Sequence, residues 1–177
     1  MIDMALRPGR CYHHITQRAW TRISIHAPPK SYVKGVPVGK IHQFEVGNAK
    51  GKAGFPLAYS LVPTRDRQFR SNCLESARVM ASKYLAQNLG DQGFFFKMRK
   101  YPHHVLRENP LATGAGADRF SQGMRLSWGK AIGSAARVLA GEKLLTAWVP
   151  EGKDAIAKEA LHRAIAKLPG SCRIVKG

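Results

Sequence analysis

The sequence is short of cysteine and lacks long apolar runs, and each shortage argues against a class of protein. Its 177 residues contain three widely spaced cysteines, Cys11, Cys73 and Cys172. An odd, scattered set does not suit a disulfide scaffold, so a reducing, cytoplasmic location is the simpler interpretation. No apolar run approaches the roughly 18 residues that span a bilayer, and no apolar stretch follows the N-terminal charges. We therefore expect neither a membrane-spanning protein nor a secretory precursor.

Acidic residues are also scarce, and this shortage is the strongest indication in the sequence of what the protein binds. There are 11 Asp and Glu against 29 Lys and Arg, which gives a formal net charge of +18. Self-repulsion at such a charge is destabilising, so a polyanionic partner is expected, with nucleic acid as the first candidate. A membrane surface would require a basic amphipathic helix with aromatic residues on its apolar side, and no expected helix has that pattern. Apolar residues make up 44% of the chain, too many for a disordered basic tail.

Residues 1–54 are predicted to form a basic N-terminal arm with short strands, as part of the same domain as the rest of the chain. From Arg7 to Lys52 there are nine Lys and Arg residues and one acid, Glu45. Prolines and glycines recur there, and apolar residues show no sustained helical period. Such a segment is typical of extended chain that lies against a partner. A solvated loop region is the alternative, which the aromatic residues among the bases disfavour.

Residues 55–177 are predicted to form an α+β domain, with an antiparallel sheet layer and two helices packed on one of its faces. The first helix is expected to be capped by Asn72, with Glu75 completing a capping box, and to end at Gly90. The second is expected to be capped by Asp154 and to stop at Pro169-Gly170, with apolar residues at three-and-four spacing along it and with Glu159 and Arg163 spaced to pair on its outer face.

Strands are predicted from alternating apolar residues at 57–61 and 94–99, with a closing strand at 171–175. Segments 135–140 and 144–149 are predicted to pair as a hairpin, because Gly141-Glu142-Lys143 can supply its turn. Phe94 and Phe96 are expected to pack in the core in preference to stacking on bases.

The stretch at 108–133 has neither a helical nor a strand period, and it is predicted to be a long loop. It contains five glycines, and basic residues both flank it and lie within it. Because glycine lacks a Cβ atom, Gly114 and Gly116 allow backbone amides to approach a phosphate closely. Long loops of this kind are usually functional or disordered, and this one is expected to become ordered on a polyanionic partner.

No arrangement of residues predicts an enzyme, a metal site or a cofactor. Gly114-x-Gly116 is too short for a dinucleotide fingerprint, and no Gly-Lys-Ser or Gly-Lys-Thr occurs. No carboxylate pair or triad is visible, and Cys11-x-His13-His14 lacks a second close pair of ligands. A thiolate would be favoured at Cys73 near a helix start, but a small buried side chain is the commoner outcome. We instead expect four histidines to lie against phosphates: His13, His14, His103 and His104.

Several motifs, taken in order, carry a family resemblance. They are Arg7-Pro8-Gly9-Arg10-Cys11-Tyr12, Gly35-Val36-Pro37, Leu74-Glu75-Ser76-Ala77-Arg78, Pro102-His103-His104-Val105-Leu106-Arg107 and the run ATGAGADRFSQGMRLSWGK from Ala112 to Lys130. Together they resemble the large-subunit ribosomal proteins called L-ten-e in archaea and eukaryotes and L-sixteen in bacteria. The resemblance covers nearly the whole chain, and its archaeal form is favoured because the sequence stops at Gly177.

This resemblance implies a structural constituent of the large ribosomal subunit, in the cytoplasm and in a single copy per subunit. Its partners would be large-subunit rRNA, neighbouring ribosomal proteins, and the A-site and P-site tRNAs near the glycine-rich loop. The family assists subunit maturation and tRNA accommodation, and catalysis belongs to the RNA. The rival interpretations are a stand-alone RNA-binding assembly factor, an RNA-processing enzyme using His103 or His104, and a chromatin-like DNA binder.

The resemblance and the basic segments together give two sets of candidate site residues. The expected rRNA-binding residues are Arg7, Arg10, Arg18, Arg22, Lys34, Lys40, Lys97, Arg99 and Lys100. The expected tRNA-proximal loop residues are Arg107, Asn109, Gly114, Gly116, Asp118, Arg119, Gly123, Met124, Arg125 and Lys130.

Three departures from the family pattern stand out. The segment Ile23–Lys30 is longer and less charged than is usual, and Leu126-Ser127-Trp128 replaces a typically smaller series, so the stem of the loop is expected to pack differently. The start Met4-Ala5-Leu6-Arg7-Pro8 resembles the usual beginning of the family, which suggests translation from Met4.

Overall fold

In the computed structural model, described for residues 6–24, 26–28, 30–109, 111–112 and 114–177, the chain has two α-helices and eight strands among these residues. The suggested start at Met4, and Ile25 and Pro29 of the segment Ile23–Lys30, lie outside the described residues. The elements are β1 Glu45–Gly47, β2 Leu57–Pro63, β3 Arg67–Arg70, α1 Ser71–Leu89, β4 Phe95–Met98, β5 His104–Glu108, β6 Lys130–Val138, β7 Leu145–Val149, α2 Asp154–Ile165 and β8 Cys172–Lys176. Short 3₁₀ turns span Gly9–Cys11, Lys50–Gly54 and Ala117–Arg119.

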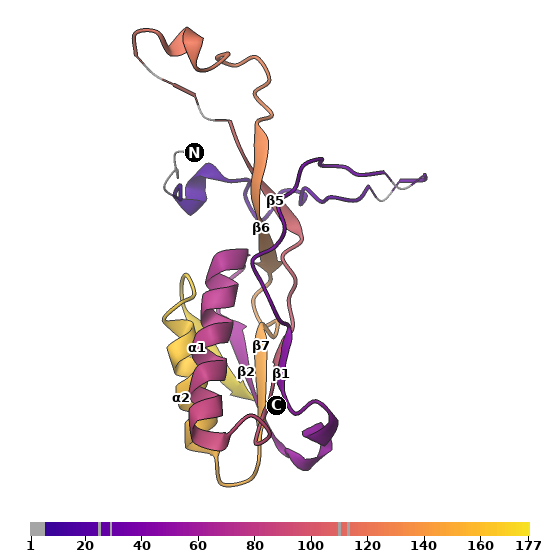
Figure 1. The fold of residues 1–177 in the computed structure, drawn as a ribbon, viewed down its shortest axis with the longest axis vertical. Coiled ribbons are helices and arrows are strands. Elements are labelled where there is room, and N and C mark those ends of the chain that lie inside the picture. Colours follow the sequence, from indigo (N-terminus) through magenta and orange to yellow (C-terminus); the bar gives the residue numbers. More distant parts are fainter. Residues whose placement is uncertain (1–5, 25, 29, 110, 113) are drawn as a thin grey trace. The chain divides into compact units, whose positions relative to one another are not determined.

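The described residues gather into two compact units. One unit draws on Met1–Val38 and His103–Ser134, and the other on Gly39–Pro102 and Ala135–Gly177. The second unit holds both helices and a five-stranded antiparallel sheet in the order β1-β4-β7-β2-β8. Both helices lie on one side of this sheet, α1 against α2 (Figure 1). This is an α+β layer arrangement, as the sequence predicts.

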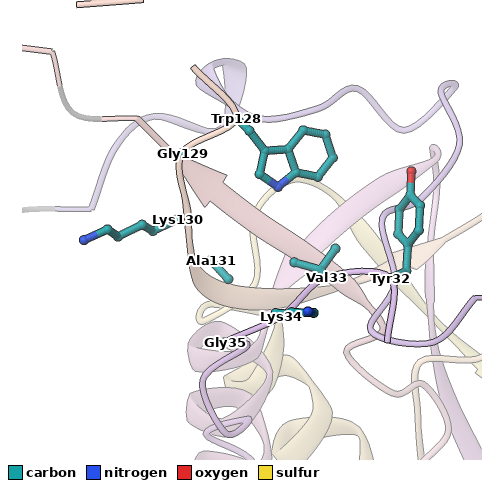
Figure 2. Close-up of a pocket in the computed structure, with 8 residues that line it drawn as sticks. All are labelled: Tyr32, Val33, Lys34, Gly35, Trp128, Gly129, Lys130 and Ala131. Carbon is teal, nitrogen blue, oxygen red and sulfur yellow. The ribbon is translucent and has the colours of Figure 1, made fainter. Parts of the chain in front are cut away.

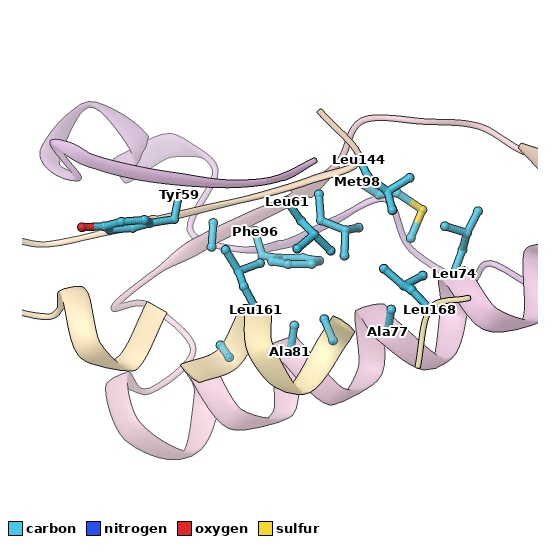
Figure 3. Close-up of a cluster of buried hydrophobic side chains, with 14 of the residues drawn as sticks. Tyr59, Leu61, Leu74, Ala77, Ala81, Phe96, Met98, Leu144, Leu161 and Leu168 are labelled. Atoms are coloured by element: carbon cyan, nitrogen blue, oxygen red, sulfur yellow. The ribbon is translucent and has the colours of Figure 1, made fainter. Parts of the chain in front are cut away.

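The core of the second unit lies between the sheet and the helices (Figure 3). Tyr59 and Leu61 alternate along β2 with Ser60, so that their side chains face Leu74 and Leu161 on the helices. Phe94 and Phe96 are fully buried in the same cluster, which confirms them as core residues. Phe95 is buried as well, on the opposite face, where its ring stacks on Trp148 at 5.0 Å. Strand β4 is therefore apolar on both faces at this position.

The start of α1 differs from the expected capping box. The helix begins at Ser71, and Arg70 occupies the cap position without a side-chain hydrogen bond, so the expected cap Asn72 is the second residue of the helix. Both carboxylate oxygens of Glu75 accept hydrogen bonds from Arg78, at 2.9 and 2.6 Å, so this side chain is not available to the helix start. The predicted end is confirmed, because Gly90 takes a positive φ of 70° and its N–H donates to the Ala86 carbonyl.

The second helix also begins without the expected cap. Asp154 is its first residue, and its carboxylate accepts a hydrogen bond from the hydroxyl of Tyr59 on β2. This bond lowers the pKa of Asp154 and raises the pKa of Tyr59. The predicted pair of Glu159 and Arg163 is confirmed at 2.8 Å. The sequence thus places the helix correctly, but a distant strand decides what its first carboxylate binds.

The predicted hairpin between 135–140 and 144–149 is wrong. Strand β6 lies between β3 and β5 in a separate three-stranded sheet, whereas β7 lies between β4 and β2. The chain between them bonds elsewhere: the Leu144 N–H donates to the Leu61 carbonyl and the Ala140 N–H donates to Asp66. Because residues 140–144 are hydrogen-bonded to β2 and to the residues after it, segments 135–140 and 144–149 do not pair with each other as a hairpin. The single predicted sheet layer is therefore two sheets.

Candidate nucleic-acid interface

The basic side chains of residues 6–40 are exposed, and within the described part of the chain few of them have an acidic partner. Exposed guanidinium and ammonium groups are found at Arg7, Arg10, Arg18, Arg22, Lys34 and Lys40. Arg7 pairs with Glu108 at 3.4 Å, and Glu108 also accepts a hydrogen bond from the Tyr12 hydroxyl. Exposed bases of this kind can neutralise phosphates, which is the main source of protein affinity for nucleic acids.

The three predicted rRNA-binding residues of β4 and the chain after it have partners within the second unit. Lys97 pairs with Glu45 at 2.5 Å, and Lys100 pairs with Glu142 at 2.7 Å. The hydrogen bond from Lys100 lowers the pKa of the Glu142 carboxyl. The Arg99 guanidinium lies 5.1 Å from the centre of the Trp148 ring. A phosphate at this surface would compete with these carboxylates, so these residues are weaker candidates than the exposed bases of residues 6–40.

Arg107, a predicted loop residue on β5, lies against two indole rings. Its guanidinium is 3.6 Å from the centre of the Trp20 ring and 3.3 Å from that of Trp128, and it donates a hydrogen bond to the Trp128 carbonyl. Burial lowers the pKa of Arg107, while the neighbouring Tyr32 acts in the opposite direction. Arginine keeps its charge in proteins, so two electron-rich rings face a permanent cation. The cluster ties β5 to the residues on which the loop returns.

Histidines 13 and 104 belong to the same aromatic cluster. The His13 ring stacks on the Trp20 ring, with 4.0 Å between the ring centres. His104 is fully buried, and its Nδ1 accepts a hydrogen bond from the backbone N–H of Trp20 at 3.0 Å. The expectation that His104 lies against phosphate is therefore wrong, because the residue is fully buried within the protein. Its neighbour His103 is exposed, since successive side chains of extended chain point in opposite directions.

A cavity of about 450 Å³ adjoins this cluster, and it is lined by residues of both the predicted N-terminal arm and the predicted loop. Its lining includes Tyr12 and His14 near the N-terminus, and Arg107, Asn109 and Ser127 at the two ends of the loop. Arg107 and Asn109, two of the predicted loop residues, both line this cavity. Trp20 and Trp128 are not recognisable from the sequence as partners of Arg107, although Trp128 belongs to the unusual series Leu126-Ser127-Trp128.

The predicted glycine-rich loop lies between β5 and β6. Gly114, Gly116 and Gly123 all have positive φ, at 114°, 77° and 58°, which glycine tolerates far better than other residues. Exposed side chains follow, among them Arg119, Met124 and Arg125. Thr113 and the side chain of Asp118 lie outside the described residues. Strand β6 begins at Lys130, so the last four residues of the expected loop, 130–133, belong to a strand.

Gly129 closes the loop against the end of β5. A Cβ atom on Gly129 would lie 2.3 Å from the carbonyl oxygen of Glu108 and 2.7 Å from the backbone nitrogen of Asn109. Its φ of 71° is also unfavourable for other residues. The two ends of the loop can approach this closely because position 129 has no side chain.

The described residues contain no group of three potential metal-ligating side chains, and their cysteines are free thiols. The pKa of the Cys73 thiol is raised because it is buried, and its Sγ lies 3.0 Å from the carbonyl oxygen of Arg70. A raised pKa disfavours the reactive thiolate, which supports the structural interpretation of Cys73. No helix in the described ranges has the length and apolar content to cross a membrane.

Comparison with known proteins identifies the family. The model of the family described as ribosomal protein L16p/L10e matches residues 20–175. The chain belongs to the L16p/L10e family of ribosomal proteins. It is 47% identical over 172 residues to the large ribosomal subunit protein uL16 of Methanococcus maripaludis, with 97% of this chain and 94% of that protein covered. It is 48% identical to the protein of the same name from Staphylothermus marinus, with the same coverage.

The uL16 protein of Archaeoglobus fulgidus is 42% identical to the chain over 172 residues, covering 97% of the chain and 93% of that relative. These archaeal relatives confirm the resemblance and its archaeal form. L16p/L10e members are structural ribosomal proteins, so the prediction that the chain is not an enzyme is confirmed as well.

Proposed function

We propose that this chain is a structural constituent of the large ribosomal subunit, bound to rRNA in the cytoplasm in one copy per subunit. The observation that carries the proposal is the near-complete match to archaeal proteins named large ribosomal subunit protein uL16. The net charge of +18 and the exposed bases of residues 6–40 support it, because rRNA is the polyanion that such a protein would neutralise.

Residues 1–54 would act as the basic rRNA-binding arm. Its contacts would be Arg7, Arg10, Arg18, Arg22, Lys34 and Lys40, with Lys97, Arg99 and Lys100 as further contacts from the remainder of the chain. RNA helices hide their base edges in a deep groove, so these side chains would recognise phosphate positions and RNA shape. Other ribosomal proteins would adjoin the chain on the subunit.

The glycine-rich loop would lie beside the A-site and P-site tRNAs and assist tRNA accommodation and late subunit maturation. The residues proposed for this role are Arg107, Asn109, Gly114, Gly116, Asp118, Arg119, Gly123, Met124, Arg125 and Lys130. Arg119 and Arg125 are exposed on the described part of the loop, where they could reach phosphates. The backbone at Gly114 and Gly116 leaves room for such an approach, because no atom lies within 4 Å of a Cβ position there.

Sedimentation of the native protein through a sucrose gradient, before and after a high-salt wash, tests this proposal. We expect one copy per large subunit and release only at high salt, because phosphate contacts weaken as salt rises. A protein that sediments free of subunits, or at well below one copy, would contradict the proposal. That result would favour an assembly factor, or an RNA-processing enzyme whose activity should then depend on His103.

A further inference from the structure

A second cavity, of about 520 Å³, opens in the unit that contains residues 6–38 and 103–134 (Figure 2). It lies between residues 32–35 and residues 128–131. Lys34, predicted as an rRNA contact, and Lys130, predicted as a loop residue beside tRNA, line the same cavity. The two sets of candidate residues that the sequence keeps apart therefore meet at one site. Its volume is within the roughly 300–1,000 Å³ that is usual for ligand sites.

Two aromatic rings line this cavity above an apolar residue. Tyr32 and Trp128 are 53% and 50% exposed, an unusual degree for large aromatic side chains, while Val33 beside them is 3% exposed. Trp128 already contacts the Arg107 guanidinium and the Trp20 ring, but about half of each of the two side chains stays exposed and is available for stacking. Aromatic side chains of this kind stack on nucleic-acid bases of any sequence.

The backbone at Tyr32 and the ring of Trp128 are held in place before any ligand binds. The Tyr32 N–H donates to the Arg22 carbonyl at 2.6 Å, beside the bridge between Ile23 and Ser31. Trp128 is fixed by the Arg107 guanidinium 3.3 Å from its ring centre, and the adjacent Gly129 packs against the end of β5. A site whose groups are already ordered loses less entropy on binding.

The charge of the cavity is complementary to phosphate. Lys34 and Lys130 are both exposed at the cavity, and none of the described residues that line it is acidic. An acidic peptide would form ion pairs with the lysines but would not contact the aromatic rings. An apolar ligand would contact the rings but would leave the lysines without an anionic partner. A nucleotide uses both features, because its base stacks and its phosphates are anionic.

We propose that this cavity binds one unpaired nucleotide of the large-subunit rRNA. The base stacks on Tyr32 and Trp128, and the flanking phosphates lie against Lys34 and Lys130. Single-stranded RNA is commonly recognised by such stacking, since its unpaired bases can turn outward. The inference rests on the proposed rRNA binding and adds to it a specific site. It also gives the unusual Trp128 a role in binding.

The test uses the full chain and protein-free large-subunit rRNA, with the dissociation constant measured at one fixed salt concentration. We expect Tyr32→Ala to weaken binding roughly 5- to 100-fold, the loss typical of one base-stacking contact. Tyr32→Phe keeps the ring and should bind as the wild type does. Phe120→Ala is the matched control, because Phe120 is an exposed aromatic residue of the same unit that does not line the cavity.

Chemical probing of base accessibility in the same complexes provides a second measurement. One unpaired base should be protected by the wild type and by Tyr32→Phe and become reactive with Tyr32→Ala. Ultraviolet cross-linking of the unaltered protein should join that nucleotide to a peptide that contains Tyr32 or Trp128, which needs no variant to fold.

Unchanged affinity of Tyr32→Ala together with a cross-link elsewhere would overturn the nucleotide site while rRNA binding stood. Weakening by Lys34→Ala and Lys130→Ala without any effect of Tyr32→Ala would do the same, since it would indicate phosphate contacts without a stacked base. Failure of the wild type to bind rRNA at all would instead contradict the proposed function.

Discussion

The guanidinium of Arg107 lies 3.3 Å from the centre of the Trp128 ring and donates a hydrogen bond to the Trp128 carbonyl. This contact joins the strand that leads into the glycine-rich loop to the residue on which the loop returns. Trp20 covers the same guanidinium at 3.6 Å, so residues near the N-terminus contribute to the root of the loop. The loop is therefore anchored at its base.

Replacing Arg107 with Lys should loosen the root of the loop. Lysine keeps the charge but lacks the planar group that lies flat against two indoles, so we expect a loss of about 1–2 kcal/mol in local stability. Hydrogen exchange of the amides at 126–131 should then become faster. Arg125→Lys is the control, because Arg125 is exposed within the loop. Equal exchange in both variants would show that the rings do not hold the loop.

Gly129→Ala should destabilise the chain, because the new Cβ atom would lie 2.3 Å from the Glu108 carbonyl oxygen in a left-handed backbone conformation. We expect a loss of about 1–3 kcal/mol, or several degrees in the thermal midpoint. Gly133→Ala provides the comparison, since no atom lies within 4 Å of its Cβ position and its φ is not left-handed. A similar midpoint for both variants would contradict the close approach at position 129.

Replacing Lys34 and Lys40 together with Ala should weaken rRNA binding and reduce its salt dependence. Each lost phosphate contact removes roughly 0.7–0.9 from the slope of log affinity against log salt. Binding titrations at several salt concentrations measure this slope directly. The double variant Lys83→Ala and Lys167→Ala removes the same charge from exposed positions outside the predicted set. If both double variants lower the slope equally, the effect comes from net charge and not from these two contacts.

Deletion of residues 112–116 should leave rRNA binding intact and slow tRNA accommodation. The reason is that the stacking contacts at the root of the loop, from Trp20, Arg107 and Trp128, lie outside the deletion. Subunits carrying the deleted protein can be compared with wild-type subunits in a single-turnover accommodation assay. Loss of the protein from subunits would instead identify the loop as an rRNA anchor.

Glu75→Gln should lower stability at neutral pH and have little effect in acid. Both oxygens of Glu75 accept hydrogen bonds from Arg78, and this holds the pKa of Glu75 below its ordinary value although partial burial acts the other way. A carboxyl with a lowered pKa in the folded state stabilises the protein above its unfolded pKa of about 4.3, and this contribution is lost as pH falls through the folded pKa.

The free energy of unfolding of Glu75→Gln should therefore be about 1–2 kcal/mol below that of the wild type at pH 7. The difference should shrink as the pH falls below 4.3. Glu159→Gln is the matched control on the other helix, where the pair with Arg163 is 45% exposed at both side chains and should contribute within about 0.5 kcal/mol. A constant difference across the whole pH range would mean that Glu75 acts through packing alone.

The helices, the family and the chemical character of the partner can be recognised without the structure. Leu74, Ala77 and Leu85 repeat at helical spacing, and Gly90 ends the helix by its own backbone freedom. The family follows from the motifs around Gly114 and Lys130, and the net charge of +18 points to a polyanion. These features are local or additive, so no knowledge of distant contacts is needed to recognise them.

The tertiary structure is needed to know which distant residues meet. It placed β6 and β7 in different sheets, bound Asp154 to Tyr59, and buried His104 beneath Trp20. It also brought Lys34 and Lys130 to one cavity, 96 residues apart in the sequence. The periodicity of apolar residues indicates which face of a helix or strand is buried, but it does not indicate which other segment packs against that face. Pairings between distant segments depend on the packing of the whole chain, and the stacking and cavity residues of this protein are pairings of that kind.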